Sequence, residues 1–148
     1  MAVKIISHLI PQFLASRERS EMTPSEELRW IHDCVLLETV FDASVASVRS
    51  LRVKIRCPTN LGYPRWAGRI IAINFADVAV FSHVGWGISS GYDSFDRFRP
   101  QISKELQDRT LEARHMGIRF PDIEFSMLLH SGSILEGICG LISIEINP

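Results

Sequence analysis

A histidine and an aspartate that are adjacent in the chain, His32 and Asp33, have the clearest capacity for chemistry. Imidazole and carboxylate groups both bind metal ions, and the chain has 5 histidines. A metal-dependent phosphohydrolase, however, needs further His and Asp ligands on a nearly all-helical scaffold, and here a strand pattern begins soon after Asp33. We therefore expect no metal site. We interpret His32 and Asp33 as structural residues that end a helix, with the Asp33 carboxylate accepting hydrogen bonds from nearby backbone N–H groups.

Motifs for other catalytic chemistry are absent from the sequence. No G-x-S-x-G segment places a serine nucleophile, and the G-x-G of residues 85–87 has neither the third glycine nor the helix of a nucleotide-binding loop. The sequence therefore favours a non-enzymatic protein without a cofactor. The alternative is a small enzyme or ligand-binding domain with a pocket near four residues, His32, Asp33, His83 and His130.

Basic residues are concentrated in the middle of the chain. Between positions 43 and 76 there are no acidic residues, and three of the cations alternate with apolar residues along one predicted strand: Arg52, Lys54 and Arg56. Side chains on one face of a strand repeat every 6.6–7 Å or so, close to the phosphate spacing of nucleic acids. We expect these cations either to pair with Glu38, Glu124 or Glu145 on neighbouring strands or to bind an acidic protein surface. Nucleic acid is the less expected partner, although Trp66 in the adjoining loop could stack on bases.

An aromatic-rich segment, residues 86–98, has the composition of a protein interface. Trp86, Tyr92 and Phe95 lie there among aspartates and arginines, and Trp, Tyr and Arg are enriched at binding hot spots. One interpretation is a surface that binds a protein partner, and a homodimer that buries this segment is a further possibility. The other interpretation is that Phe95 fills the space between a loop and the following helix.

The elements that position these residues follow from hydrophobic periodicity. Helices are predicted within residues 1–20, over residues 24–31 with a Thr23 and Glu26 capping box, and over residues 100–116. Strands are predicted over residues 35–41, 51–57, 69–75, 78–81, 123–129 and 138–146. Short connections favour antiparallel pairing. The predicted fold is α+β: one curved, mainly antiparallel sheet of about five or six strands with two or three helices packed on one face.

Length and composition limit the class of protein. The 148 residues are 46% hydrophobic and 22% charged, which is typical of one globular domain over residues 1–148, with a helical segment at 1–32 and a sheet and helix region at 33–148. The net charge of −1 favours neither nucleic acid nor an acidic membrane. The 3 cysteines are widely spaced, so we expect buried free thiols in a cytoplasmic protein. No apolar run is long enough to span a membrane.

Two segments carry a resemblance to a known group of proteins. Residues 30–36, W-I-H-D-C-V-L, precede an alternating strand, and residues 71–78 read I-A-I-N-F-A-D-V. This pattern resembles small bacterial domains with a W-x-H-D start and a strand meander, some of which are similar to immunity proteins of polymorphic-toxin systems. The resemblance implies a protein that neutralises a toxin by binding it. Together with the missing catalytic motifs, it predicts a non-enzymatic protein-binding module.

Overall fold

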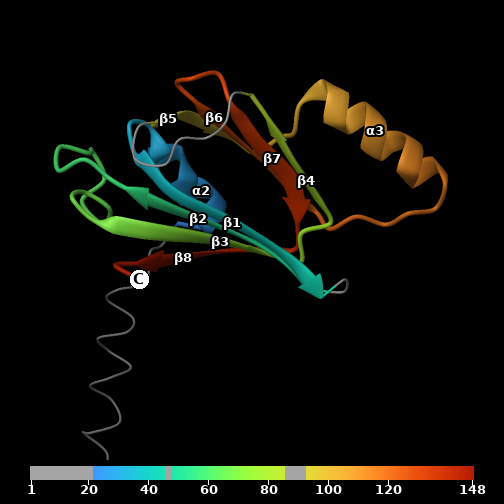
Figure 1. Cartoon of the computed structure of the whole chain (residues 1–148), viewed down its shortest axis with the longest axis horizontal. Coiled ribbons are helices and arrows are strands. Elements are labelled where there is room, and N and C mark those ends of the chain that lie inside the picture. The colour runs from blue at the N-terminus through green and yellow to red at the C-terminus, as the bar shows by residue number, and fades with distance from the viewer. Residues whose placement is uncertain (1–21, 46–47, 86–92) are drawn as a thin grey trace, which may run out of the picture.

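The computed structural model describes residues 22–45, 48–85 and 93–148. The helix predicted within residues 1–20 lies outside this part of the chain. Eight strands form two antiparallel sheets of four strands each, packed face to face (Figure 1). In spatial order the first sheet contains β1 (Val35–Val45), β2 (Val48–Arg56), β3 (Ile70–Ala76) and β8 (Leu141–Ile146). The second contains β4 (Val80–Val84), β7 (Ile134–Cys139), β6 (Ile123–Leu129) and β5 (Phe95–Arg99).

The single sheet of five or six strands predicted from sequence is therefore wrong in detail, although the fold combines helices with antiparallel sheet as expected. The chain crosses between the sheets twice, once from β3 to β4 and once from β7 to β8. Asp77 lies at the first crossing with a φ of 52°, and Gly140 at the second donates its N–H to the Ala76 carbonyl at 3.0 Å. A Cβ at position 140 would lie 3.0 Å from the Asp77 Cβ, so glycine lets the two crossings pack together. The run 138–146, expected to be one strand, divides there.

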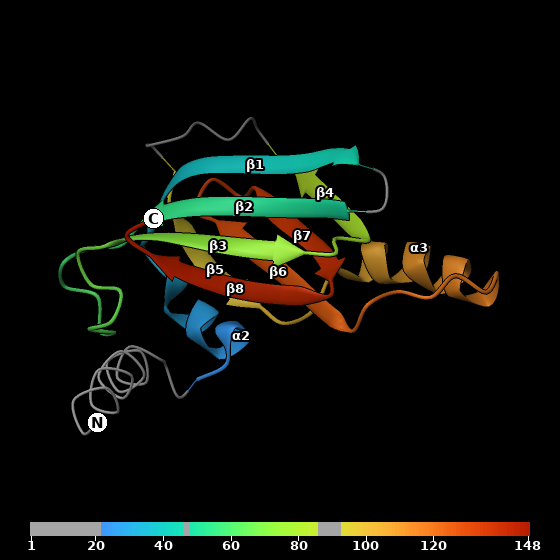
Figure 2. The same ribbon diagram turned by 90° about the horizontal axis from the view of Figure 1, so that it is seen from below.

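The core lies between the two sheets, whose strands cross obliquely in Figure 2. Leu51, Val53 and Ile55 alternate along β2 and are all fully buried, which confirms the inward face predicted for this strand. Phe75 of β3 stacks on Phe125 of β6 with ring centroids 4.2 Å apart, and both side chains are 0–1% exposed. This aromatic pair joins the two sheets at the centre of the molecule.

The first helical segment closes one end of the space between the sheets. It consists of α2 (Pro24–Glu27) and the 3₁₀ turn η1 (Leu28–Ile31), and the predicted Thr23 and Glu26 capping box is present. η1 contacts β5 and α2 contacts β8, so the segment reaches both sheets. Leu28 and Ile31 are fully buried in the core. This burial, rather than the propensity of so short a helix, must hold the segment in place.

The second helix, α3 (Lys104–His115), lies outside the two sheets and extends past them (Figure 2). Ile102 and Leu106 pack against Ile138 on the outer side of β7. The buried carboxylate of Glu136 accepts hydrogen bonds from the backbone N–H and hydroxyl of Ser103, both at 2.7 Å, and Ser103 caps the helix. The prediction that the helices pack on one face of a sheet is therefore wrong. The Glu136 carboxylate holds α3 on the outer side of the second sheet.

Candidate functional site

The two sheets meet at a corner where β1 and β5 begin. An isolated antiparallel bridge joins Val35 to Ser94, and Leu36 donates its N–H to the Asp93 carbonyl at 2.9 Å. The backbone N–H of Asp33 bonds the Phe95 carbonyl at 2.8 Å, and that of His130, in the turn between β6 and β7, bonds the Ser94 carbonyl at 2.9 Å. Two loops that are distant in sequence are thus anchored to adjacent residues of one segment.

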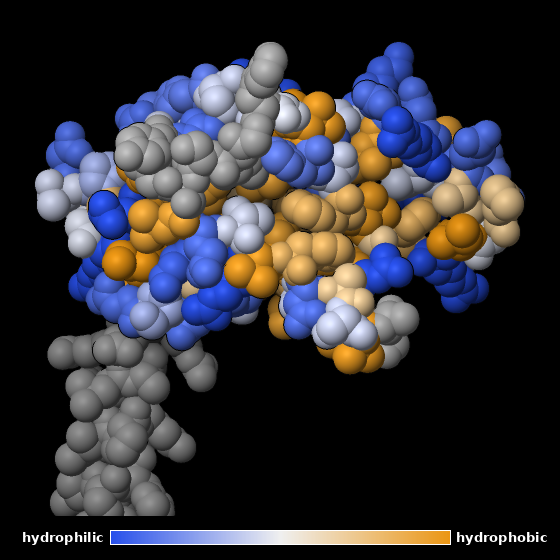
Figure 3. Space-filling view, in the orientation of Figure 1, coloured by the Kyte–Doolittle hydropathy of each residue, from blue (hydrophilic) through white to orange (hydrophobic). Residues whose placement is uncertain are grey.

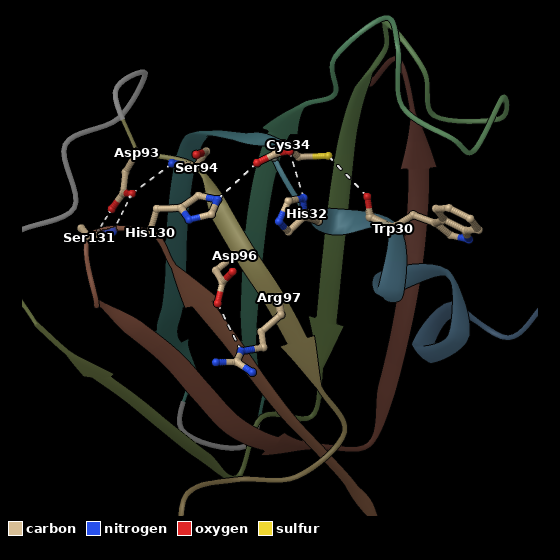
Figure 4. Close-up of polar contacts among 10 residues, drawn as sticks. Trp30, His32, Cys34, Asp93, Ser94, Asp96, Arg97, His130 and Ser131 are labelled. Carbon is tan, nitrogen blue, oxygen red and sulfur yellow. Dashed lines mark hydrogen bonds and ion pairs between the residues drawn. The ribbon is translucent and has the colours of Figure 1, made fainter.

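These anchors bring His32, Asp33 and His130 together at the surface. His32 Nδ1 lies 2.9 Å from Asp33 Oδ2, and His130 Nε2 lies 3.2 Å from Asp33 Oδ1. The rings of the two histidines meet edge to face, with centroids 5.6 Å apart (Figure 4). The side chains of His32, Asp33 and His130 are 57%, 60% and 44% exposed, so the cluster is open to solvent. As predicted, His32 and Asp33 follow the last residue of a helical turn, but both Asp33 oxygens contact imidazoles.

The turn that carries His130 is braced by a second polar pair. Ser131 donates its hydroxyl to Asp93 Oδ2, and its backbone N–H points to Asp93 Oδ1 at 3.4 Å (Figure 4). Asp93 Oδ1 also accepts the N–H of Ser94 at 3.0 Å. Asp33 has a φ of 63°, a left-handed conformation that Asp adopts more readily than most residues. The backbone bonds of Asp33 and His130 hold the two loops at the corner, so the fold brings the three side chains close to one another.

His83, the fourth residue of the predicted pocket, lies at a different place. It is on β4 and lines an open groove between β4 and β1, the edge strands of the two sheets, together with Thr39, Phe41 and Phe81. The groove has a volume of about 590 Å³. Phe41 and Phe81 stack across it with centroids 4.9 Å apart, and Phe41 remains 40% exposed. Figure 3 shows apolar residues gathered between the two sheets on this side of the molecule.

The edges of the groove carry backbone groups that no strand in the described part of the chain pairs. β1 pairs with β2 along one edge. Along its other edge, the backbone hydrogen bonds to described residues are limited to those of Val35 and Leu36. β4 likewise pairs only with β7. The Thr39 hydroxyl oxygen is buried and has no hydrogen-bond partner among the described residues. Among the described residues, the groove therefore offers apolar and polar side chains, backbone groups without a strand partner and one buried polar atom.

The three cations of β2 form a mixed face with nearby carboxylates. Arg52 lies 3.4 Å from Glu145 of β8 and also bonds the Asn74 side chain. Lys54 is opposite Glu38 in the register of β1 and β2. Glu124 is on the other sheet, where it accepts the N–H of Ile102. The prediction of cross-strand pairing therefore holds for Arg52, while Arg56 is an exposed cation at the end of the strand.

Two residues predicted to contact a partner are instead part of the core. Trp66 is 0% exposed and donates its indole N–H to the buried carboxylate of Glu27 at 3.0 Å, and Arg65 pairs with the same carboxylate. Phe95 is also 0% exposed, because the segment expected to be a loop forms β5 and turns this ring inward. Neither ring can stack on a partner in this structure. Trp86 and Tyr92 lie outside the described residues.

The cysteines are free and buried, as predicted. The Cys34 thiol lies 3.1 Å from the Cys57 sulfur, and this contact together with burial raises the pKa of Cys34. Burial raises the pKa of Cys139 to about 11. Buried neutral thiols are poor nucleophiles, so these cysteines pack as small apolar side chains.

Comparisons with protein-family models, with curated proteins and with solved structures gave no match for this chain. No helix in the described ranges is both long enough and apolar enough to cross a membrane.

Sequence reasoning located the corner cluster only as part of a larger predicted pocket, and it missed the groove. Thr39, Phe41 and Phe81 carried no motif, and their role depends on β1 and β4 being edge strands of separate sheets. The sequence feature that came nearest to indicating the groove was the strand predicted over residues 35–41, which is mostly apolar and is followed by a polar segment. This strand does not have two buried faces. Such a strand is typical of a sheet edge.

Proposed function

We propose that the chain is a non-enzymatic protein-binding module whose partner contributes an extended segment to the groove between β1 and β4. The observation that supports this proposal is the pair of edge strands that face each other across an open groove, whose lining combines apolar side chains such as Phe41 and Phe81 with the polar side chains of Glu38, Thr39 and His83. An extended peptide can hydrogen-bond to a free strand edge while its alternate side chains enter apolar pockets. Proteins usually protect a long edge strand, and beyond Leu36 no described residue pairs with this edge of the 11-residue β1, which favours a binding role.

The side chains of the groove suit such a segment. Thr39 and Phe41 face inward from β1, since they are paired with the buried Val53 and Leu51 of β2. Phe81 of β4 faces the same space, opposite Phe41. The inner faces of two packed sheets are normally covered, and an aromatic ring that is 40% exposed there has apolar surface left to bury. We infer that apolar side chains of the partner cover this ring.

The resemblance to toxin-neutralising immunity domains agrees with this mode of action, because such proteins act by binding. A toxin is therefore the partner class that we propose. The mixed charges of the β2 face make it the weaker binding surface, since Arg52 is already paired with Glu145.

Site-specific photo-crosslinking tests the proposed surface. A photoreactive phenylalanine analogue is introduced at position 41 in the groove, at position 54 on the outer face of β2, or at position 111 on α3, and the full chain is irradiated in cells of its source. Leu111 is 51% exposed and serves as the matched control. We expect one discrete protein adduct from position 41 and none from position 111, with the cross-linked peptide mapping to one short segment of the partner.

Binding to the identified partner then separates the two surfaces. Phe41→Asp should weaken the affinity at least tenfold, about 1.4 kcal/mol, because it places a charge against an apolar contact. A triple variant with glutamate at positions 52, 54 and 56 should change it less than threefold. Adducts from position 54 alone, or a larger loss in the triple variant, would move the binding surface to the β2 face. The absence of adducts at both positions would contradict a protein-binding function.

A further inference from the structure

We propose that His32, Asp33 and His130 bind a divalent transition-metal ion, and that Zn²⁺ fits the site best. This inference goes beyond the protein-binding function and does not depend on the groove. One ligand atom from each of the three side chains lies within 4.8 Å of the other two. Two imidazole nitrogens and a carboxylate oxygen are a ligand set that zinc accepts.

Each imidazole nitrogen lies beside one oxygen of the Asp33 carboxylate, at a separation close to that between neighbouring ligand atoms of a zinc site. Bonds of 2.0–2.2 Å or so in a tetrahedral arrangement place neighbouring ligand atoms about 3.3 Å apart. His32 Nδ1 and Asp33 Oδ2 are separated by 2.9 Å, and His130 Nε2 and Asp33 Oδ1 by 3.2 Å. The two imidazoles are about half exposed, so each has room to rotate the small amount that brings its nitrogen to the ion. Their edge-to-face arrangement already points one ring toward the other.

The backbone places the ligands before any ion arrives. The backbone N–H of Asp33 donates to the Phe95 carbonyl at 2.8 Å, and that of His130 donates to the Ser94 carbonyl at 2.9 Å. The bonds of Ser131 to Asp93 brace the turn next to His130. Metal sites gain affinity when groups outside the ligand shell fix the ligands in this way. The fold therefore fixes the backbone of the two loops that carry the ligands, while the three side chains are ordered when the ion binds.

The cluster contributes little to the stability of the fold on its own. All three side chains are exposed to solvent, where polar contacts of this kind contribute little to stability. A metal ion changes the role of this cluster. It would link the junction of η1 and β1 to the turn between β6 and β7, and three protein ligands leave a fourth position for water. From the sequence, His32, Asp33 and His130 were placed in one alternative pocket together with His83, but no metal site was predicted there.

Zinc titration of the metal-free full chain tests the proposal, with a chromophoric chelator as competitor. We expect one Zn²⁺ per chain, and a loss of affinity of at least tenfold in His32→Ala and in His130→Ala. His115→Ala is the matched control, because His115 is an exposed histidine on α3 and is not part of the cluster. That variant should differ from the wild type by less than twofold.

Cobalt provides a second measurement that identifies the ligands. Co²⁺ at this site should give the visible absorption bands of a four-coordinate complex without the charge-transfer band of a thiolate ligand, which excludes the three cysteines. Circular dichroism in the presence of a chelator checks that each variant is folded. If His130→Ala does not fold, the zinc affinities of His32→Ala and Asp33→Asn, both at exposed positions, test the site instead. A wild type that does not bind Zn²⁺, binding unchanged in the ligand variants, or a thiolate band would overturn the proposal.

Discussion

Two aromatic pairs join the sheets, and they do so in opposite environments. Phe75 and Phe125 stack at the centre of the core, where both are 0–1% exposed. Phe41 and Phe81 stack in the same manner at the edge strands, where Phe41 is 40% exposed. The first pair is surrounded by side chains from both sheets, whereas the second borders an open groove. The same contact between sheets thus contributes to folding in one region and leaves apolar surface for binding in the other.

The difference arises from how the two sides of the molecule are closed. At the corner of β1 and β5, backbone hydrogen bonds and the Val35 to Ser94 bridge join the sheets. Farther along, no such bonds join this edge of β1 to other described residues, and β4 faces it across the groove. One strand therefore belongs to a sealed region at its start and to an open region at its middle. This difference predicts how substitutions in the two regions behave.

Truncating one ring of each pair should give the largest contrast. Phe125→Ala removes a fully buried ring and should lower the free energy of unfolding by about 3–5 kcal/mol. Phe41→Ala removes a partly exposed ring and should lower it by only about 1 kcal/mol. Urea denaturation followed by circular dichroism measures both values on the full chain. Equal losses in the two variants would show that the groove is closed in solution and would remove the distinction between the pairs.

Local sequence patterns were sufficient for most of the strands and helices but not for their arrangement. The alternation of residues 51–57 predicted the buried face of β2, and the Thr23 and Glu26 pair predicted the start of α2. These features depend on neighbouring residues alone. The division into two sheets depends on Asp77 and Gly140 lying against each other, a contact between positions 63 residues apart, since 140 − 77 = 63. Periodicity carries no information about such a contact.

The candidate sites show the same limit. His32, Asp33 and His130 were grouped in one alternative pocket, but His83 was wrongly included, because the corner depends on Ser94 and Phe95, where no strand was predicted. Trp66 and Phe95 were named as candidate partner contacts because aromatic residues near arginines are typical of interfaces, although packing inside the protein was the other interpretation of Phe95. Their burial follows from a tertiary contact with Glu27 in one case and from inward orientation on β5 in the other. Residue type alone does not distinguish these outcomes.

Thiol reactivity compares the two regions without a change of stability. A cysteine introduced by His83→Cys lies at an exposed position in the groove and should react with a disulfide reagent at pH 8 at least a hundredfold faster than Cys34 or Cys139. The contact with Cys57 together with burial raises the pKa of Cys34, and burial raises that of Cys139 to about 11, so little thiolate forms at this pH. The wild-type chain is the control.

The same pKa shift has a consequence for stability. The folded chain holds the Cys139 proton more tightly than the unfolded chain, so the free energy of unfolding should fall as the pH rises from about 9 towards 11. This loss should be smaller in Cys139→Ala. In the labelling experiment with His83→Cys, fast reaction of Cys34 and Cys139 at pH 8 would indicate that the buried region around them opens as readily as the groove.

The smallest predicted effect concerns Thr39, at the boundary of the two regions. Its hydroxyl oxygen is buried without a hydrogen-bond partner among the described residues, so Thr39→Val should raise the free energy of unfolding by about 0.5–1 kcal/mol. Thr39→Ser keeps the hydroxyl and should bring no such gain. If a partner's backbone bonds this oxygen, the valine variant should also bind the partner more weakly, despite its greater stability. A destabilised valine variant would mean that water already satisfies the hydroxyl, and it would place Thr39 on the open side of the boundary.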